Sequence, residues 1–125
     1  MLMKRLLIVD DEANIRLVVK EYAEFEGYEV AEAEDGMQAV ELVKSQDFDV
    51  IIMDIMMPRL NGYEATKQIR SLKNRPNAVT IPIIAMTANA FAEDIQASLE
   101  SGMNAHIAKP LVMEEVIKVI SVNLN

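Results

Sequence analysis

Short apolar runs alternate along this chain with longer stretches of helical periodicity, and this alternation constrains the fold more than any other feature. After each run, apolar residues recur three and four positions apart, which is the spacing of one helix face. The runs predict strands over residues 6–9, 28–33, 50–53, 81–86 and 105–108. Alternating strands and helices indicate a parallel sheet with right-handed crossovers and helices on both faces. We therefore predict an α/β fold, a doubly wound (βα)5 three-layer sandwich around one five-stranded sheet.

Two of the predicted strands differ in the burial that their composition indicates. Residues 50–53 are all apolar, which is typical of a strand covered on both faces of a parallel sheet. The run over residues 28–33 is half polar, with Glu29 and Glu32 between apolar residues, and this pattern suits an edge strand.

The helical stretches carry their own start and stop signals. Asp35 and Asn61 have the spacing of N-caps, and Gly27 and Gly102 are expected just past the ends of helices. Residues 73–80 contain two Asn and one Pro and predict a surface loop. The positions expected to face inward are Ile15, Val18, Val19, Tyr22 and Phe25 in the first helix, Val40 and Val43 in the second, Ala65, Ile69 and Leu72 in the third, Phe91, Ile95 and Leu99 in the fourth, and Met113, Val116, Ile117, Ile120 and Leu124 in the last.

Length and composition limit the functions that the chain can carry. At 125 residues it has room for one domain, residues 1–125, and we expect no separate output domain. A net charge of −8, from 12 basic and 20 acidic residues, argues against direct binding to nucleic acid. The lack of Cys and the single His exclude disulfides, thiol catalysis and a His-rich metal cage. The apolar run after Lys4 and Arg5 is too short for a signal peptide or a membrane span, so a cytoplasmic protein without membrane contact is expected.

Polar residues follow four of the predicted strands, at the edge where parallel sheets bind their ligands. They are Asp10 and Asp11 after the first strand, Asp54 after the third, Thr87 after the fourth and Lys109 after the fifth. Neighbouring carboxylates repel one another unless a cation neutralises them, and Mg²⁺ typically binds one or two carboxylates, a phosphate and waters. An ammonium and a hydroxyl beside them suit a phosphoryl group, and Asp can act as the nucleophile that forms an aspartyl phosphate. The pattern therefore predicts a phosphoryl site with Asp54, the central strand-end carboxylate, as acceptor.

The chain resembles, over essentially its whole length, the receiver domain of two-component response regulators, including the single-domain chemotaxis regulators. Four motifs at predicted strand ends carry the resemblance: Ile8-Val9-Asp10-Asp11-Glu12, Met53-Asp54-Ile55-Met56-Met57-Pro58 followed by Gly62, Met86-Thr87-Ala88, and Lys109-Pro110. The resemblance implies that Asp54 accepts a phosphoryl group from a phosphohistidine on a partner. It also implies a Mg²⁺ (or Mn²⁺) site made by Asp10, Asp11, Asp54 and the backbone carbonyl of Met56. Such a protein is a signalling phospho-acceptor rather than an enzyme, and it promotes its own phosphotransfer and dephosphorylation.

The same resemblance implies the flavodoxin-like strand order 2-1-3-4-5, which places the half-polar second strand at an edge. It implies that Lys109 and Thr87 contact the phosphoryl group and that the bond between Lys109 and Pro110 is cis. In the family, phosphorylation draws the hydroxyl residue inward, and an aromatic residue of the last strand turns from exposed to buried. His106 stands at that position, where Tyr or Phe is usual, and both a switch role and an ordinary strand role stay open for it. The implied partners are a histidine kinase or phosphotransfer protein and an unidentified downstream protein.

Other functions fit the strand-end acids less well. A phosphatase of the haloacid dehalogenase type also uses a strand-end Asp, but it needs a second Asp where this chain has Met56, which cannot transfer protons. A flavodoxin-like electron carrier needs a phosphate loop rich in Gly and hydroxyl groups, and the acidic residues 10–12 would repel a phosphate. A purely structural receiver-like domain would be expected to have a broken acid pocket, whereas this one is complete.

Two contexts and two oligomeric states stay open for a receiver of this sequence. Where the chain starts and ends favours a free-standing regulator, whereas residues 86–90 and the loop before the fourth strand resemble receivers of hybrid sensor histidine kinases. Both a monomer and a phosphorylation-dependent homodimer are compatible with the sequence. The residues that would form a dimer or partner face, unless burial of the terminal helix accounts for the valines, are Val112, Val119, Val122, Phe91 and Ile95.

Overall fold

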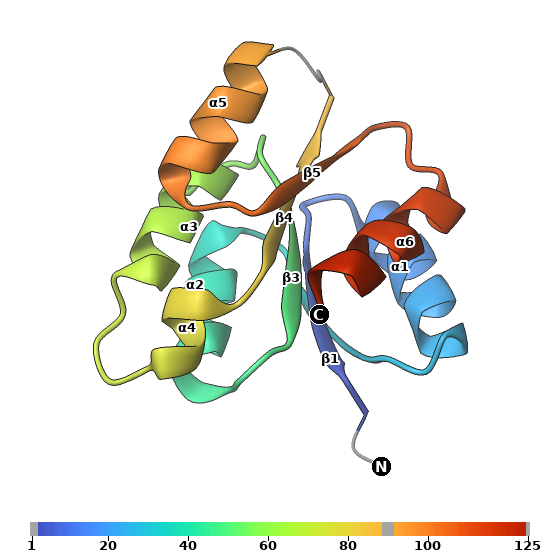
Figure 1. Ribbon diagram of the computed structural model, residues 1–125, viewed down its shortest axis with the longest axis horizontal. Coiled ribbons are helices and arrows are strands. Elements are labelled where there is room, and N and C mark those ends of the chain that lie inside the picture. Colours follow the sequence, from blue (N-terminus) through green and yellow to red (C-terminus); the bar gives the residue numbers. More distant parts are fainter. Residues whose placement is uncertain (1–2, 89–91, 125) are drawn as a thin grey trace.

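Five parallel strands form one sheet at the centre of the molecule in the computed structural model, which describes residues 3–88 and 92–124 (Figure 1). The strands are β1 (Arg5–Val9), β2 (Glu29–Ala33), β3 (Val50–Asp54), β4 (Ile83–Thr87) and β5 (Ala105–Ala108). Their order across the sheet is β2-β1-β3-β4-β5, and every neighbouring pair is parallel. The predicted order is confirmed, and the half-polar β2 lies at an edge.

Helices cover both faces of the sheet, so the molecule has the predicted three layers (Figure 1). The helices are α1 (Ala13–Phe25), α2 (Gly36–Ser45), α3 (Gly62–Arg70), α4 (Pro76–Thr80), α5 (Ala92–Ser101) and α6 (Met113–Asn123). Helices α1 and α6 lie on one side of the sheet, and α2, α3, α4 and α5 lie on the other. No helix in the described part of the chain is long and apolar enough to cross a membrane.

The alternation of side chains along the strands divides the core into two clusters. In β1, Leu7 and Val9 belong to the cluster that contains the buried side chains of α2, α3 and α4, whereas Leu6 and Ile8 belong to the cluster of α1 and α6. Every residue of β3 and β4 is buried. The all-apolar run at residues 50–53 therefore lies in a strand covered on both faces, as predicted.

Helix α1 buries only part of the face that we expected, because Val19 is buried and Ile15 packs against the core while three other predicted residues are exposed. Its buried residues are Val19 and Ala23, whereas Val18 is 44% exposed, Tyr22 46% and Phe25 86%. Val19 and Ala23 are four residues apart and point to the same side of a helix.

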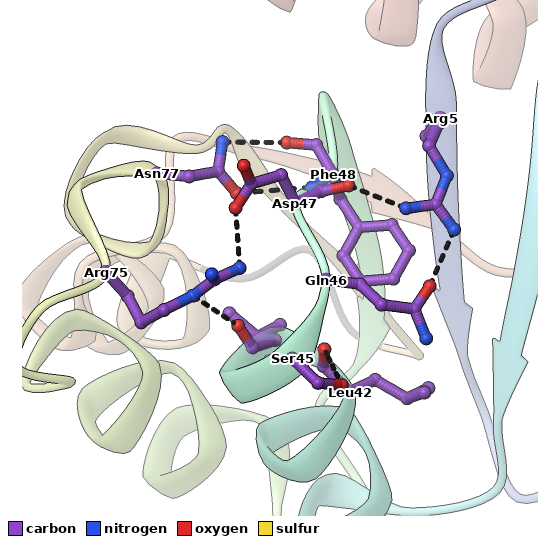
Figure 2. A network of polar contacts seen from close by, with 9 residues as sticks. Arg5, Leu42, Ser45, Gln46, Asp47, Phe48, Arg75 and Asn77 are labelled. Atoms are coloured by element: carbon purple, nitrogen blue, oxygen red, sulfur yellow. Dashed lines mark hydrogen bonds and ion pairs between the residues drawn. The ribbon is translucent and has the colours of Figure 1, made fainter.

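Residues 73–80, predicted as a loop, contain the short helix α4. Pro76 occupies its first turn, where the missing N–H has no helical partner to lose, and Ala78 is buried. The side chain of Asn77 donates to the backbone carbonyl of Phe48 over 3.0 Å and accepts from its N–H over 3.2 Å (Figure 2). Asn77 thus replaces a strand neighbour for Phe48, just before β3 begins.

Two arginines fasten the same loop between α2 and β3 (Figure 2). Arg75 donates to the Val43 carbonyl over 3.1 Å and to an Asp47 carboxylate oxygen over 2.5 Å. Arg5 donates to the Asp47 carbonyl over 3.0 Å, and its guanidinium carbon lies 4.9 Å from the centre of the Phe48 ring. These contacts hold the amino end of β3, the end opposite to Asp54.

The remaining boundaries differ little from the prediction. Strand β4 begins at Ile83, after Pro82, rather than at residue 81. Gly27 and Gly102 have φ values of +93° and +106°, as expected for residues that end helices in the left-handed conformation. Leu99, expected to face inward, is 55% exposed, and the predicted inward residue Phe91 lies outside the described residues.

The valines considered for a partner face do not share one environment. Val112 and Val122 are exposed, whereas Val119 is partly buried against the core cluster of α1 and α6. Burial of α6 therefore accounts for Val119 alone.

Candidate functional site

The predicted polar residues meet at the carboxyl end of the sheet. Asp10 directly follows β1, Asp54 ends β3 and Thr87 ends β4, and all three are buried. Lys109 follows β5 directly and is half-buried. Parallel strands bring their carboxyl ends to one edge, and the structure therefore joins residues that lie up to 99 positions apart in the sequence.

Lys109 connects two of the carboxylates. Its Nζ atom lies 3.2 Å from Oδ2 of Asp10 and 3.4 Å from Oδ1 of Asp54. The Lys109 backbone N–H donates to the Thr87 carbonyl over 2.8 Å, and the peptide bond to Pro110 is cis. One ammonium therefore lies beside two buried carboxylates.

Asp11 and Glu12 extend the acidic group toward solvent. Carboxylate oxygens of Asp10, Asp11 and Glu12 all lie within 4.8 Å of one another, and Asp11 and Glu12 are exposed. The N–H of Glu12 donates to Oδ1 of Asp10 over 2.9 Å and fixes that carboxylate. From the sequence, Glu12 was one member of a motif and not a predicted metal ligand. The signal that could have identified it is its place directly after two acids at a strand end.

The loop from β3 to α3 brings its backbone close to Asp54. The N–H of Met56 donates to Oδ1 of Asp54 over 3.3 Å, while the Met56 side chain faces solvent. The N–H of Gly62 donates to the Ile55 carbonyl over 2.9 Å. A Cβ atom on Gly62 would lie 2.6 Å from the Asp54 carbonyl oxygen, so this close return of the loop requires glycine.

The charges of the site are unbalanced without a cation. Burial raises the pKa of Asp54 to about 6, with a further contribution from the Asp10 carboxylate, against the opposing effect of Lys109. Burial also raises the pKa of Asp10, and the hydrogen bond from Glu12 and the charge of Lys109 oppose that increase. Burial alone would lower the pKa of Lys109, but the carboxylates of Asp54 and Asp10 outweigh it and raise that pKa. One ammonium thus only partly compensates the acids around it.

This set of donors fits a hard divalent cation. Carboxylate and carbonyl oxygens are the ligands that Mg²⁺ prefers, and no soft sulfur or imidazole ligand is involved. The exposed acids Asp11 and Glu12 give a cation access from solvent. The raised pKa of Asp54 means that its charged form is disfavoured, and a bound cation would stabilise that form. A phosphoryl group bound to Asp54 would be within reach of Lys109, which already contacts that carboxylate.

His106 lies apart from this group of residues. It is exposed on the edge strand β5 and pairs in register with Ala85 of β4. It lines a groove of about 690 Å³ between β5 and α6, together with Glu115 and Lys118. Its side chain therefore belongs to this groove and not to the cluster of carboxylates.

The comparisons with known proteins agree with this geometry. The family model for the response regulator receiver domain matches residues 6–121. The sensor protein GacS of Pseudomonas syringae pv. syringae is 36% identical over 116 residues, which are 93% of this chain and 13% of GacS. This chain thus spans only a small part of that relative.

Two solved structures show the same architecture. Chemotaxis protein CheY4 of Vibrio cholerae is 31% identical with a TM-score of 0.91, over 97% of this chain and 98% of CheY4. The receiver domain of the sensor histidine kinase PA1611 from Pseudomonas aeruginosa PAO1 is 35% identical with a TM-score of 0.88, over 98% of both chains. That structure contains a magnesium ion coordinated in its active site cleft.

Proposed function

Because this chain belongs to the response regulator receiver domain family, we propose that Asp54 is its phospho-acceptor and that a histidine kinase or phosphotransfer protein is the donor. The observation that carries the proposal is the contact of Lys109 with both buried carboxylates, Asp10 and Asp54, at the carboxyl end of the sheet. The relatives include a sensor protein and a chemotaxis protein, and the same site would serve a free-standing regulator or a receiver within a hybrid kinase.

The residues that would hold Mg²⁺ are Asp10, Asp11, Asp54 and the backbone carbonyl of Met56. Mn²⁺, which also prefers oxygen ligands, would bind the same set. When bound, the ion supplies positive charge that stabilises the phosphoryl oxygens during transfer. Glu12, which lies beside Asp10 and Asp11, adds negative charge at the entrance of the site.

The transfer step balances with the groups present in the donor and the acceptor. A carboxylate oxygen of Asp54 attacks the phosphorus atom, the P–N bond to the donor imidazole breaks, and that nitrogen keeps the electron pair and takes up a proton. With its pKa at about 6, Asp54 is mostly ionised at pH 7 and ready to attack. Lys109 and the Thr87 hydroxyl would contact the phosphoryl oxygens, and attack of water on the acyl phosphate would return the free carboxylate.

The signal would leave through the surface next to Thr87. Movement of Thr87 toward the phosphoryl group would vacate space beside β4 and let the exposed His106 on β5 turn inward. A downstream protein, or a second copy of the chain, would then bind the altered surface. His106 is the proposed switch residue because it lies three positions before Lys109 on the strand that Thr87 pairs with.

Intact-mass spectrometry after incubation with a small acyl phosphate and Mg²⁺ tests this function. The protein is expected to gain the mass of one phosphoryl group, and Asp54→Asn is expected to gain none. Asp49→Asn is the matched control, because Asp49 directly precedes β3 at the amino end of the sheet and should leave labelling unchanged. Full labelling of Asp54→Asn would refute the assignment of the acceptor.

A further inference from the structure

An ion pair outside the acid cluster ties down the loop that carries Met56. Asp35, the N-cap of α2, is 3% exposed, and Arg59 lies in the loop between β3 and α3. Arg59 donates from Nε to Oδ2 of Asp35 over 3.1 Å and also from its terminal nitrogen to the same oxygen. Oδ1 of Asp35 accepts from the N–H of Gln38 over 2.9 Å. Both oxygens of a buried carboxylate therefore have defined partners, and one of these partners belongs to the loop between β3 and α3 that carries Met56.

The backbone of the loop shows that this contact is formed at a cost. Arg59 has a φ of +66°, in the left-handed region that residues other than Gly, Asn and Asp usually avoid. Nothing in the backbone position itself favours arginine over glycine. The contact with Asp35 supplies a compensating interaction, since the Arg59 guanidinium, although most of its side chain is exposed, donates twice to a buried carboxylate.

The loop and the start of α2 also touch through their backbones. A Cβ atom on Gly36 would lie 2.4 Å from the Leu60 carbonyl oxygen, so only glycine permits this approach. The N–H of Leu60 donates to the Pro58 carbonyl over 2.8 Å, and the N–H of Gly62 donates to the Ile55 carbonyl over 2.9 Å. The segment from residue 55 to 62 is thus closed at its base and held at its tip by Arg59.

We propose that Arg59 and Asp35 form a clasp that positions the backbone carbonyl of Met56 and thereby strengthens binding of the divalent cation. Arg59 is three residues from Met56 in a short closed loop, so release of its side chain frees the orientation of that carbonyl. Partners that orient metal ligands commonly change metal affinity by about 10- to 100-fold when they are removed. This inference rests on the proposed function, because it assumes the metal site described above.

The sign of the effect separates the clasp from simple electrostatics. Arg59 carries positive charge near a cation site, so removal of that charge alone would tighten Mg²⁺ binding. Loss of positioning would weaken it. Arg59→Asn is the informative change, because Asn tolerates the left-handed conformation and adds no glycine flexibility to the loop.

Isothermal titration calorimetry with magnesium chloride tests the clasp on the metal-free protein. Arg59→Asn and Asp35→Asn are each expected to weaken Mg²⁺ binding about tenfold, and the double variant is expected to be no weaker than either. Asp35→Asn keeps an oxygen for the N–H of Gln38, so the cap of α2 is retained. Arg59→Lys should recover part of the lost affinity, because it restores the charge without the paired donors.

The control is Arg75→Ala, which removes the ion pair with Asp47 at the opposite end of the sheet and should leave Mg²⁺ affinity unchanged. Urea unfolding of each variant in a chelator separates loss of stability from loss of affinity. Unchanged or tighter Mg²⁺ binding by Arg59→Asn, or additive losses in the double variant, would overturn the clasp and leave the proposed function intact. A wild-type protein that takes up no Mg²⁺ would overturn both.

Discussion

Asp54 is buried, and yet the proposed chemistry requires it to be ionised. Its pKa of about 6 lies above that of an unfolded Asp, near 3.8, because burial and the Asp10 carboxylate disfavour its charged form. Between about pH 4 and pH 6, the folded protein therefore holds a proton that the unfolded chain has released. The free energy of unfolding falls as the pH rises through that window, and the cost is complete above pH 6.

Removal of this charge should stabilise the metal-free protein. At pH 7 we expect Asp54→Asn to raise the free energy of unfolding by about 1–3 kcal/mol, since a shift of one pKa unit corresponds to about 1.4 kcal/mol. The difference should become small near pH 4, where Asp54 is protonated in the folded protein and close to half protonated in the unfolded chain. Urea unfolding in a chelator at both pH values measures it. A variant that is less stable than wild type at pH 7 would contradict the charge imbalance at this site.

Residues whose role follows from strand ends were predictable, and residues whose role follows from loop geometry were not. Asp10, Asp54 and Lys109 could be placed together because parallel strands share one carboxyl edge. Arg59 gave no such signal, because its partner Asp35 lies 24 positions away in a different turn. The sequence shows that Asp35 caps a helix, but not that its second oxygen is available to an arginine.

At the scale of elements, periodicity predicted where helices lie better than which side they bury. In α1 the apolar residues cover more of the circumference than the sheet can contact. Ala23 is buried whereas the larger Tyr22 is exposed, and a pattern that counts only large apolar residues misses this. Helix α4 was missed because Asn and Pro favour loops, although Pro is also common in the first turn of a helix.

The hydrogen bonds of α4 give this element a measurable role. Asn77→Ala removes both partners of the Phe48 backbone, and we expect the free energy of unfolding to fall by about 1–3 kcal/mol. The exposed Asn14→Ala on α1 is a type-matched control and should change stability by less than about 0.5 kcal/mol. Mg²⁺ binding should be unchanged in Asn77→Ala because Phe48 lies at the amino end of the sheet, opposite to the carboxylates. A loss of Mg²⁺ affinity on Asn77→Ala would show that the two ends are coupled.

At the scale of the whole molecule, the net charge of −8 separates into two parts. Along the β2 edge, Glu29 lies 3.8 Å from Arg5, and Glu32 lies 3.1 Å from Arg16. Pairs of this kind near the surface contribute little to stability. At the carboxyl end of the sheet, the buried carboxylates of Asp10 and Asp54 share Lys109, and the exposed Asp11 and Glu12 add negative charge that a bound cation would use. The order of the strands, rather than any local sequence, brings that charge together.

The central claim is that the strand-end carboxylate of β3 becomes phosphorylated, and chemical trapping tests it directly. After reaction with a small acyl phosphate and Mg²⁺, borohydride reduces an aspartyl phosphate to homoserine, which peptide mass spectrometry locates. We predict homoserine at residue 54 and no reduced side chain at any other Asp or Glu. Homoserine at Asp10 or Asp11 instead, or a phosphoryl group that borohydride does not remove, would contradict the account.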